Sequence, residues 1–75
     1  MGTVYDWLAA SLVERLKVDP DLIRPGELFR DIGLDSLSQL EVLIWASDAY
    51  DVDLDPNDLP DTVGGLAEKI EELRS

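Results

Sequence analysis

The chain contains no cysteine and no histidine. Without cysteine it cannot form a disulfide framework, a thiolate-bound zinc site or a thiol nucleophile. Without histidine it lacks the commonest general base and the commonest metal ligand. A chain of 75 residues also buries a small core, which leaves little room for a deep catalytic cleft. Any acyl or thiol chemistry must therefore use a reactive group that the amino-acid sequence does not supply.

Basic residues are also scarce, since 6 Lys and Arg stand against 17 Asp and Glu. The net charge of −11 opposes binding to nucleic acid and to anionic membranes, because both need Lys and Arg. No apolar run approaches the ~20 residues of a membrane-spanning helix, and the N-terminus does not read as a signal peptide. We therefore expect a monomeric cytoplasmic protein, with no nucleic-acid or membrane partner, that forms one domain over residues 1–75.

The acidic residues are concentrated in the middle of the chain. Residues 27–61 hold ten acidic residues and a single basic one, Arg30, whereas residues 1–25 hold four acidic and three basic residues. Such a segment is either a solubilising surface or a docking face for a basic partner.

The spacing of apolar residues predicts an all-α fold. Apolar side chains recur at i+4 from Val4 onward, and no segment alternates as a β-strand does. Thr3, Asp35 and Thr62 are suitable N-caps for three helices. The predicted elements are a helix over 4–17, a long loop over 18–35, a helix over 36–50, a short helical turn at 55–59 and a last helix that follows Thr62. Together they form a small four-helix bundle with three main helices and one short helix.

The loop over 18–35 carries too many large apolar residues for a solvent-exposed connection. We expect Ile23, Leu28 and Ile32 to fix it against the core, with a short helical turn around Leu28. Long loops in compact domains are often functional.

The helix over 36–50 is apolar on two sides. One side is a core stripe, and the other carries Leu37, Leu40 and Ile44 among the acidic residues Glu41 and Asp48. Either the 18–35 loop covers this second side or a partner protein does. We favour a partner, because buried carboxylates need matching bases and the loop offers only two arginines. The wheel places Trp45 on the same outward side, where it either contacts the partner or folds back onto the core.

Ser36 lies in the first turn of this helix, directly after Asp35. Because Asp35 is the better cap, the Ser36 hydroxyl remains unused among free backbone amides and at the positive end of the helix dipole. That setting favours an anion such as a phosphate group attached to Ser36.

In the segment Phe-Arg-Asp-Ile-Gly-Leu-Asp-Ser-Leu, residues 29–37, the chain resembles the acyl carrier proteins of the stand-alone type. The resemblance extends over nearly the whole chain, including Glu41, the helix end at Tyr50-Asp51 and the helix over 62–73. It implies a four-helix bundle with a 4′-phosphopantetheine arm on Ser36, whose thiol carries acyl groups as thioesters.

The resemblance also implies partners with basic patches that dock on the second helix. These are a phosphopantetheinyl transferase and then acyltransferase, ketosynthase or adenylating enzymes. We expect the docking residues to be Leu37, Leu40, Glu41, Ile44, Trp45 and Asp48.

The residues before Ser36, Gly33-Leu34-Asp35, resemble carriers of polyketide pathways more than fatty-acid carriers. Fatty-acid carriers typically have a run of acids late in the second helix, where this chain has Trp45 and a single acid, Asp48. We favour a polyketide or other natural-product pathway. A fatty-acid carrier and an aminoacyl or peptidyl carrier remain alternatives, and the cargo is open.

Three functions of other classes compete with a carrier. Asp51-x-Asp53-x-Asp55 resembles the start of an EF-hand calcium loop, but Pro56 occupies the position that needs Gly. An enzyme that uses Ser36 as nucleophile would need a base, and no histidine exists. An acidic adaptor would explain the charge but not Asp35-Ser36. We therefore expect a carrier that is not itself an enzyme.

Overall fold

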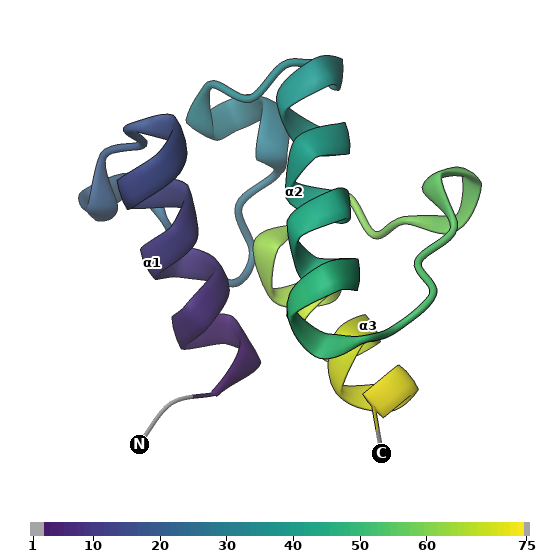
Figure 1. The fold of residues 1–75 in the computed structure, drawn as a ribbon. Coiled ribbons are helices and arrows are strands. Elements are labelled where there is room, and N and C mark those ends of the chain that lie inside the picture. Colours follow the sequence, from purple (N-terminus) through teal and green to yellow (C-terminus); the bar gives the residue numbers. More distant parts are fainter. Residues whose placement is uncertain (1–2, 75) are drawn as a thin grey trace.

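The computed structural model describes residues 3–74. Three α-helices, α1 (Val4–Leu16), α2 (Ser36–Tyr50) and α3 (Val63–Arg74), are joined by loops that contain the 3₁₀ turns η1 (Pro20–Leu22), η2 (Phe29–Ile32) and η3 (Pro56–Asp58) (Figure 1). Over residues 3–74 there is no β-strand, only an isolated antiparallel bridge between Leu28 and Thr62. The all-α prediction is confirmed, and the predicted short helix is the 3₁₀ turn η3.

Each α-helix begins at the cap that the sequence predicts. The capping bonds run from the Asp6 amide to Thr3 Oγ1 (3.1 Å), from the Ser38 amide to Asp35 Oδ1 (2.8 Å) and from the Gly65 amide to Thr62 Oγ1 (3.0 Å). Helix α1 ends at Leu16, one residue earlier than predicted, because Lys17 adopts a left-handed conformation with φ of +59°.

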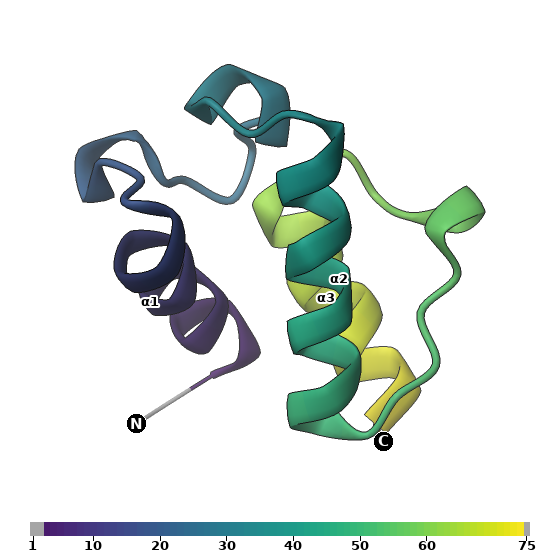
Figure 2. The same ribbon diagram turned by 45° about the horizontal axis from the view of Figure 1, so that its top comes forward.

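The three α-helices pack around one apolar core. The two views of the ribbon show how the helices are arranged (Figures 1 and 2). Most residues of the predicted apolar stripes are buried. Leu16 and Tyr50, at the ends of α1 and α2, are half-buried, and Leu73 in the last turn of α3 is 43% exposed. The buried helix residues are Val4, Leu8 and Leu12 of α1, Val42, Leu43 and Ala46 of α2, and Val63, Leu66, Ala67 and Ile70 of α3.

The long loop between α1 and α2 is held to this core differently from the prediction. Ile32 is buried as expected, but Ile23 and Leu28 are only half-buried, and the deeper contacts come from Phe29 and Leu34. The reason is that residues 29–32 form a 3₁₀ turn, in which side chains at i and i+3 lie on the same side. Phe29 and Ile32 therefore enter the core together.

Backbone hydrogen bonds tie the same loop to the start of α3. The Gly64 amide donates to the Pro25 carbonyl (2.9 Å), the Val63 amide to the Glu27 carbonyl (3.2 Å) and the Phe29 amide to the Asp61 carbonyl (2.9 Å). We call this contact of residues 25–29 with residues 61–64 the loop–α3 pairing. It supplies acceptors for amides in the first turn of α3 that have none within the helix.

The loop–α3 pairing requires glycine at position 64, because a Cβ there would lie 2.7 Å from the Pro25 carbonyl oxygen. In an ordinary helix, Gly→Ala stabilises by about 1 kcal/mol. We expect Gly64→Ala instead to lower the free energy of unfolding by about 1–2 kcal/mol, since overpacking outweighs helix propensity. Urea denaturation measures this difference.

Gly26→Ala is the matched control, because no heavy atom lies within 4 Å of a Cβ built at Gly26. This variant should be as stable as the wild-type chain or slightly more stable. A Gly64→Ala variant that unfolds at the same urea concentration as Gly26→Ala would contradict the close approach of the loop to α3.

Candidate functional site

The chain turns into α2 at Gly33, which has a φ of +94°. This conformation is strained for any residue with a Cβ and accessible to glycine. The turn is closed by hydrogen bonds from the Gly33 amide to the Arg30 carbonyl (3.3 Å) and from the Leu34 amide to the Phe29 carbonyl (3.1 Å). Gly33 therefore ends η2 and redirects the backbone toward α2.

Leu34 fixes the backbone immediately before the helix. Its side chain is buried, and its carbonyl accepts a hydrogen bond from Gln39 Nε2 (3.1 Å). Leu34 is the residue before the N-cap, and Gln39 is the fourth residue of α2. Residues at these two positions often make an apolar contact across the start of a helix. Leu34 was not among the residues predicted to lie in the core. An apolar residue placed between Gly33 and the cap Asp35 is the signal that would have found it.

Asp35 caps α2 through its carboxylate. The hydrogen bond from the Ser38 backbone amide, with a further one from the Ser38 side chain, lowers the pKa of Asp35 below its ordinary value. The carboxylate is therefore ionised at neutral pH and satisfies an amide of the first turn. No acidic residue follows it in the first turn of α2.

Ser36 is the first residue of α2, and it is exposed to solvent. It borders a shallow depression of about 200 Å³ between α2 and the segment that leads into α3, with Leu40, Leu59 and Asp61 also on its walls. The hydroxyl is thus accessible at the positive end of the helix dipole. An anionic group joined to this oxygen could project into solvent without displacing any part of the core.

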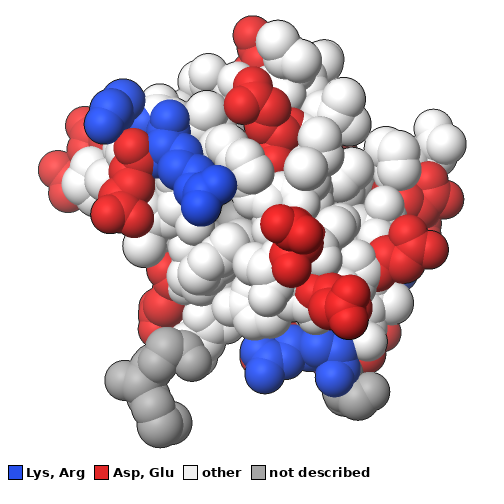
Figure 3. Space-filling model, in the orientation of Figure 1, with Lys and Arg blue, Asp and Glu red and all other residues white. Residues whose placement is uncertain are grey.

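The outward side of α2 is not covered by the loop. Leu37 is 67% exposed, Ile44 58% and Leu40 44%. Asp48 is exposed beside them and Glu41 is half-buried. We call these five residues the α2 face. The space-filling view shows acidic side chains separated by uncharged surface along this side of the molecule (Figure 3).

Trp45 does not face outward as the helical wheel predicted. Its indole is half-buried and packs against the core, and the Arg15 guanidinium of α1 lies over the ring, 4.9 Å from its centroid. Trp45 therefore forms the edge of the α2 face that borders α1. The contact with Arg15 was not predicted, because the spacing of residues along one helix does not show which residues of another helix it meets.

Residues 6–70 match the protein family described as the phosphopantetheine attachment site. The chain belongs to this family. The resemblance to acyl carrier proteins is thereby confirmed, and so is 4′-phosphopantetheine as the covalently attached cofactor. Carriers of this family interact with transferases and synthases, so proteins of these two kinds are partners of the chain.

The residues at the start of α2 fit this cofactor. Attachment needs an accessible hydroxyl, which Ser36 supplies, and the positive end of the helix dipole favours the charge of a phosphodiester. The Asp35 carboxylate, the nearest negative charge in the sequence, is engaged by the Ser38 amide.

The acidic segment after α2 does not form the calcium loop that its spacing resembles. Asp55 instead caps η3 by accepting a hydrogen bond from the Asn57 amide (2.9 Å). Across residues 3–74, no group of three or more acidic side chains is positioned to hold a metal ion. Nor does this part of the chain contain a helix long and apolar enough to cross a membrane.

The half-buried position of Trp45 predicts a stability effect of intermediate size. We expect Trp45→Ala to lower the free energy of unfolding by about 2–3 kcal/mol, below the 3–5 typical of a fully buried aromatic residue. Arg15→Ala should cost about 0.5–1 kcal/mol through the lost cation–π contact. Chemical denaturation of both single variants and of the double variant measures these terms.

The double variant is the control for this contact. Arg15→Ala should have almost no effect once Trp45 is alanine, because the two changes remove the same interaction. A Trp45→Ala chain as stable as wild type, or additive effects of the two changes, would contradict the packing of Arg15 on the indole.

Proposed function

We propose that Ser36 is the residue that carries the arm and that the chain is an acyl carrier of a polyketide or related natural-product pathway. The observation that supports the site best is the exposed Ser36 hydroxyl at the first residue of α2, directly after the buried Leu34 and the cap Asp35. When attached, the cofactor supplies a thiol on which acyl groups are carried as thioesters. We further propose that the chain performs no catalysis itself.

The contribution of the chain is to hold and present the attachment point. The turn at Gly33 and the buried Leu34 fix the backbone before Ser36, so the hydroxyl has a defined position when a transferase approaches. The helix start favours the charge of the phosphodiester. Chemistry on the acyl group is left to partner enzymes, because the chain has neither cysteine nor histidine to act as nucleophile or base.

The α2 face is the surface on which those enzymes dock in this proposal. Leu37, Leu40 and Ile44 offer apolar contact area, while Glu41 and Asp48 attract Lys and Arg of the partner. Charges of this kind raise the association rate and select the partner, and apolar contacts supply most of the affinity. Trp45 adds a specificity contact at the edge beside α1.

The choice of pathway is supported by Gly33-Leu34-Asp35-Ser36 and by the late part of α2, where Trp45 and a single acid replace an acidic run. The partners proposed on this basis are a phosphopantetheinyl transferase and a ketosynthase or acyltransferase. A fatty-acid carrier, or an aminoacyl carrier served by an adenylating enzyme, is the second candidate. Loading assays with purified enzymes of each class distinguish these pathways.

The attachment site is tested by intact-mass measurement after incubation with coenzyme A and a phosphopantetheinyl transferase. The wild-type chain should gain the mass of one phosphopantetheine, and Ser36→Ala should gain none. Ser38→Ala, which removes a hydroxyl from the same turn of α2, is the control and should be modified as the wild type is. Modification of Ser36→Ala would show that the arm is attached elsewhere.

Charge reversal on the α2 face tests the docking proposal. Glu41→Lys and Asp48→Lys should each slow phosphopantetheine transfer about two- to tenfold at low salt, because attraction becomes repulsion. The difference should shrink as salt is raised, since the screening length is about 10 Å at 0.1 M. Kinetics measured over a series of NaCl concentrations follow this dependence.

Asp53→Lys makes the same charge change at an exposed residue outside the α2 face. It should leave the transfer rate near that of the wild type. Equal slowing by all three substitutions would indicate a response to net charge alone and would remove the assignment of the α2 face.

A further inference from the structure

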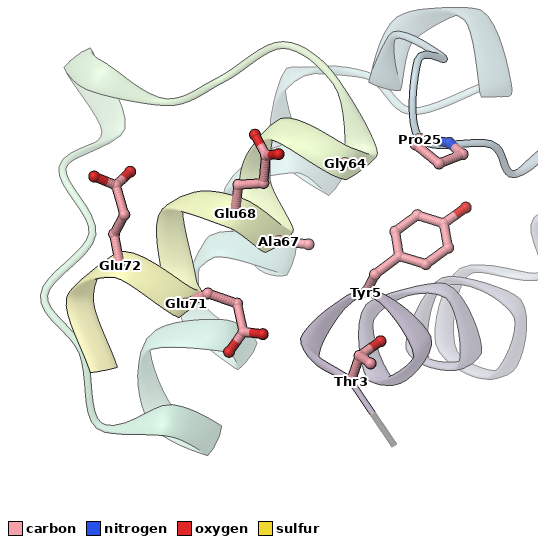
Figure 4. A pocket seen from close by; sticks show the side chains of 8 residues that line it. All are labelled: Thr3, Tyr5, Pro25, Gly64, Ala67, Glu68, Glu71 and Glu72. Atoms are coloured by element: carbon pink, nitrogen blue, oxygen red, sulfur yellow. The ribbon is translucent and has the colours of Figure 1, made fainter. Parts of the chain in front are cut away.

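A groove of about 720 Å³ lies between α1 and α3, apart from the site at Ser36. Its apolar lining includes Tyr5 of α1, Pro25 of the loop and Ala67 of α3, and none of its lining residues belongs to α2. Figure 4 shows Thr3 and Tyr5 facing Ala67 and Glu71 across this space. The function proposed for Ser36 and the α2 face does not use this surface.

The walls of the groove are held in place by contacts within the chain. The Tyr5 hydroxyl donates a hydrogen bond to the Ile23 carbonyl (3.5 Å), which joins α1 to the loop. The Gly64 amide bonds to the Pro25 carbonyl (2.9 Å) in the loop–α3 pairing. The shape of the groove therefore exists before any ligand arrives, and a ligand need not supply the free energy to form it.

The α3 side of the groove is acidic. Glu68, Glu71 and Glu72 all belong to its lining, and all three are exposed. Glu71 also lies 3.7 Å from the Arg74 guanidinium, an exposed pair that water screens. An apolar floor with carboxylates along one wall matches a ligand that is both apolar and cationic.

We propose that this groove docks a short basic segment of a partner protein. An apolar side chain of that segment packs against Tyr5, Pro25 and Ala67, and its Lys or Arg side chains meet Glu68 and Glu71. A second copy of this chain is a poor occupant, because two molecules of net charge −11 repel each other. The volume lies within the range of about 300–1,000 Å³ in which proteins bind compact ligands.

Docking at this groove leaves the arm available. Because the groove takes no residue from α2, a segment bound in it does not occupy Ser36 or the α2 face. One partner could then hold the carrier while a different enzyme acts on its cargo. The proposal is independent of attachment at Ser36, so Ser36→Ala should bind the same segment.

The test is a titration of the ¹⁵N-labelled chain with the peptide Lys-Leu-Lys-Leu-Lys-Leu, blocked at both ends, at physiological salt. The largest amide shift changes are expected at Tyr5, Gly64, Ala67 and Glu68. Glu68→Lys should weaken the affinity about tenfold, and a peptide with Glu in place of Lys should not bind. Asp53→Lys, which makes the same charge change away from the groove, should leave the affinity unchanged.

Other outcomes would overturn the proposal. Shift changes confined to α2 would assign the basic segment to the α2 face, and changes spread over every acidic segment would indicate non-specific attraction. If Glu68→Lys bound the peptide as tightly as the wild type does, the acidic side chains of α3 would not take part in binding it. Thermal unfolding followed by circular dichroism establishes that Glu68→Lys is folded, which is expected for an exposed helix position.

Discussion

The position of Ser36 depends on the backbone pairing of residues 25–29 with residues 61–64. The hydrogen bonds of this pairing hold a long loop against the start of α3 and so place η2 with Phe29 and Ile32 in the core. From η2 the chain turns at Gly33, buries Leu34 and enters α2 at Ser36. The exposed residue Ser36 is thus positioned by contacts that residues earlier in the chain make with the core and with α3.

The same pairing shapes a second surface. Gly64 and Pro25, which are joined by one of its hydrogen bonds, also line the groove between α1 and α3. The chain therefore presents an apolar and acidic face on α2 and an apolar groove with an acidic wall on α3. No residue of α2 lines the groove, so the two surfaces proposed to bind basic partners are separate from each other.

Helix positions were predictable from local signals, whereas contacts between segments were not. The i+4 spacing and the caps Thr3, Asp35 and Thr62 predicted three helices to within a residue or two, because these signals lie within one segment. The loop has no periodic spacing of apolar residues, so Ile32 was predicted to be buried but Phe29 and Leu34 were missed. The N-cap at Asp35 pointed to the Ser36 hydroxyl as unused, and the resemblance to acyl carrier proteins predicted that this hydroxyl carries the phosphopantetheine arm. The contact of Arg15 with the Trp45 ring and the groove between α1 and α3 could not be predicted, because both form only when the helices pack together.

The direction in which α2 runs has a consequence for how the carrier can be joined to other proteins. Helix α2 begins with Ser36 at one end of the molecule, while the start of α1 and the end of α3 lie toward the opposite end (Figures 1 and 2). A helix of 15 residues is about 22 Å long. A neighbouring domain joined before α1 or after α3 would lie toward the end of the molecule opposite Ser36, the proposed attachment residue. The same fold could therefore operate inside a multidomain chain without its neighbours blocking the arm.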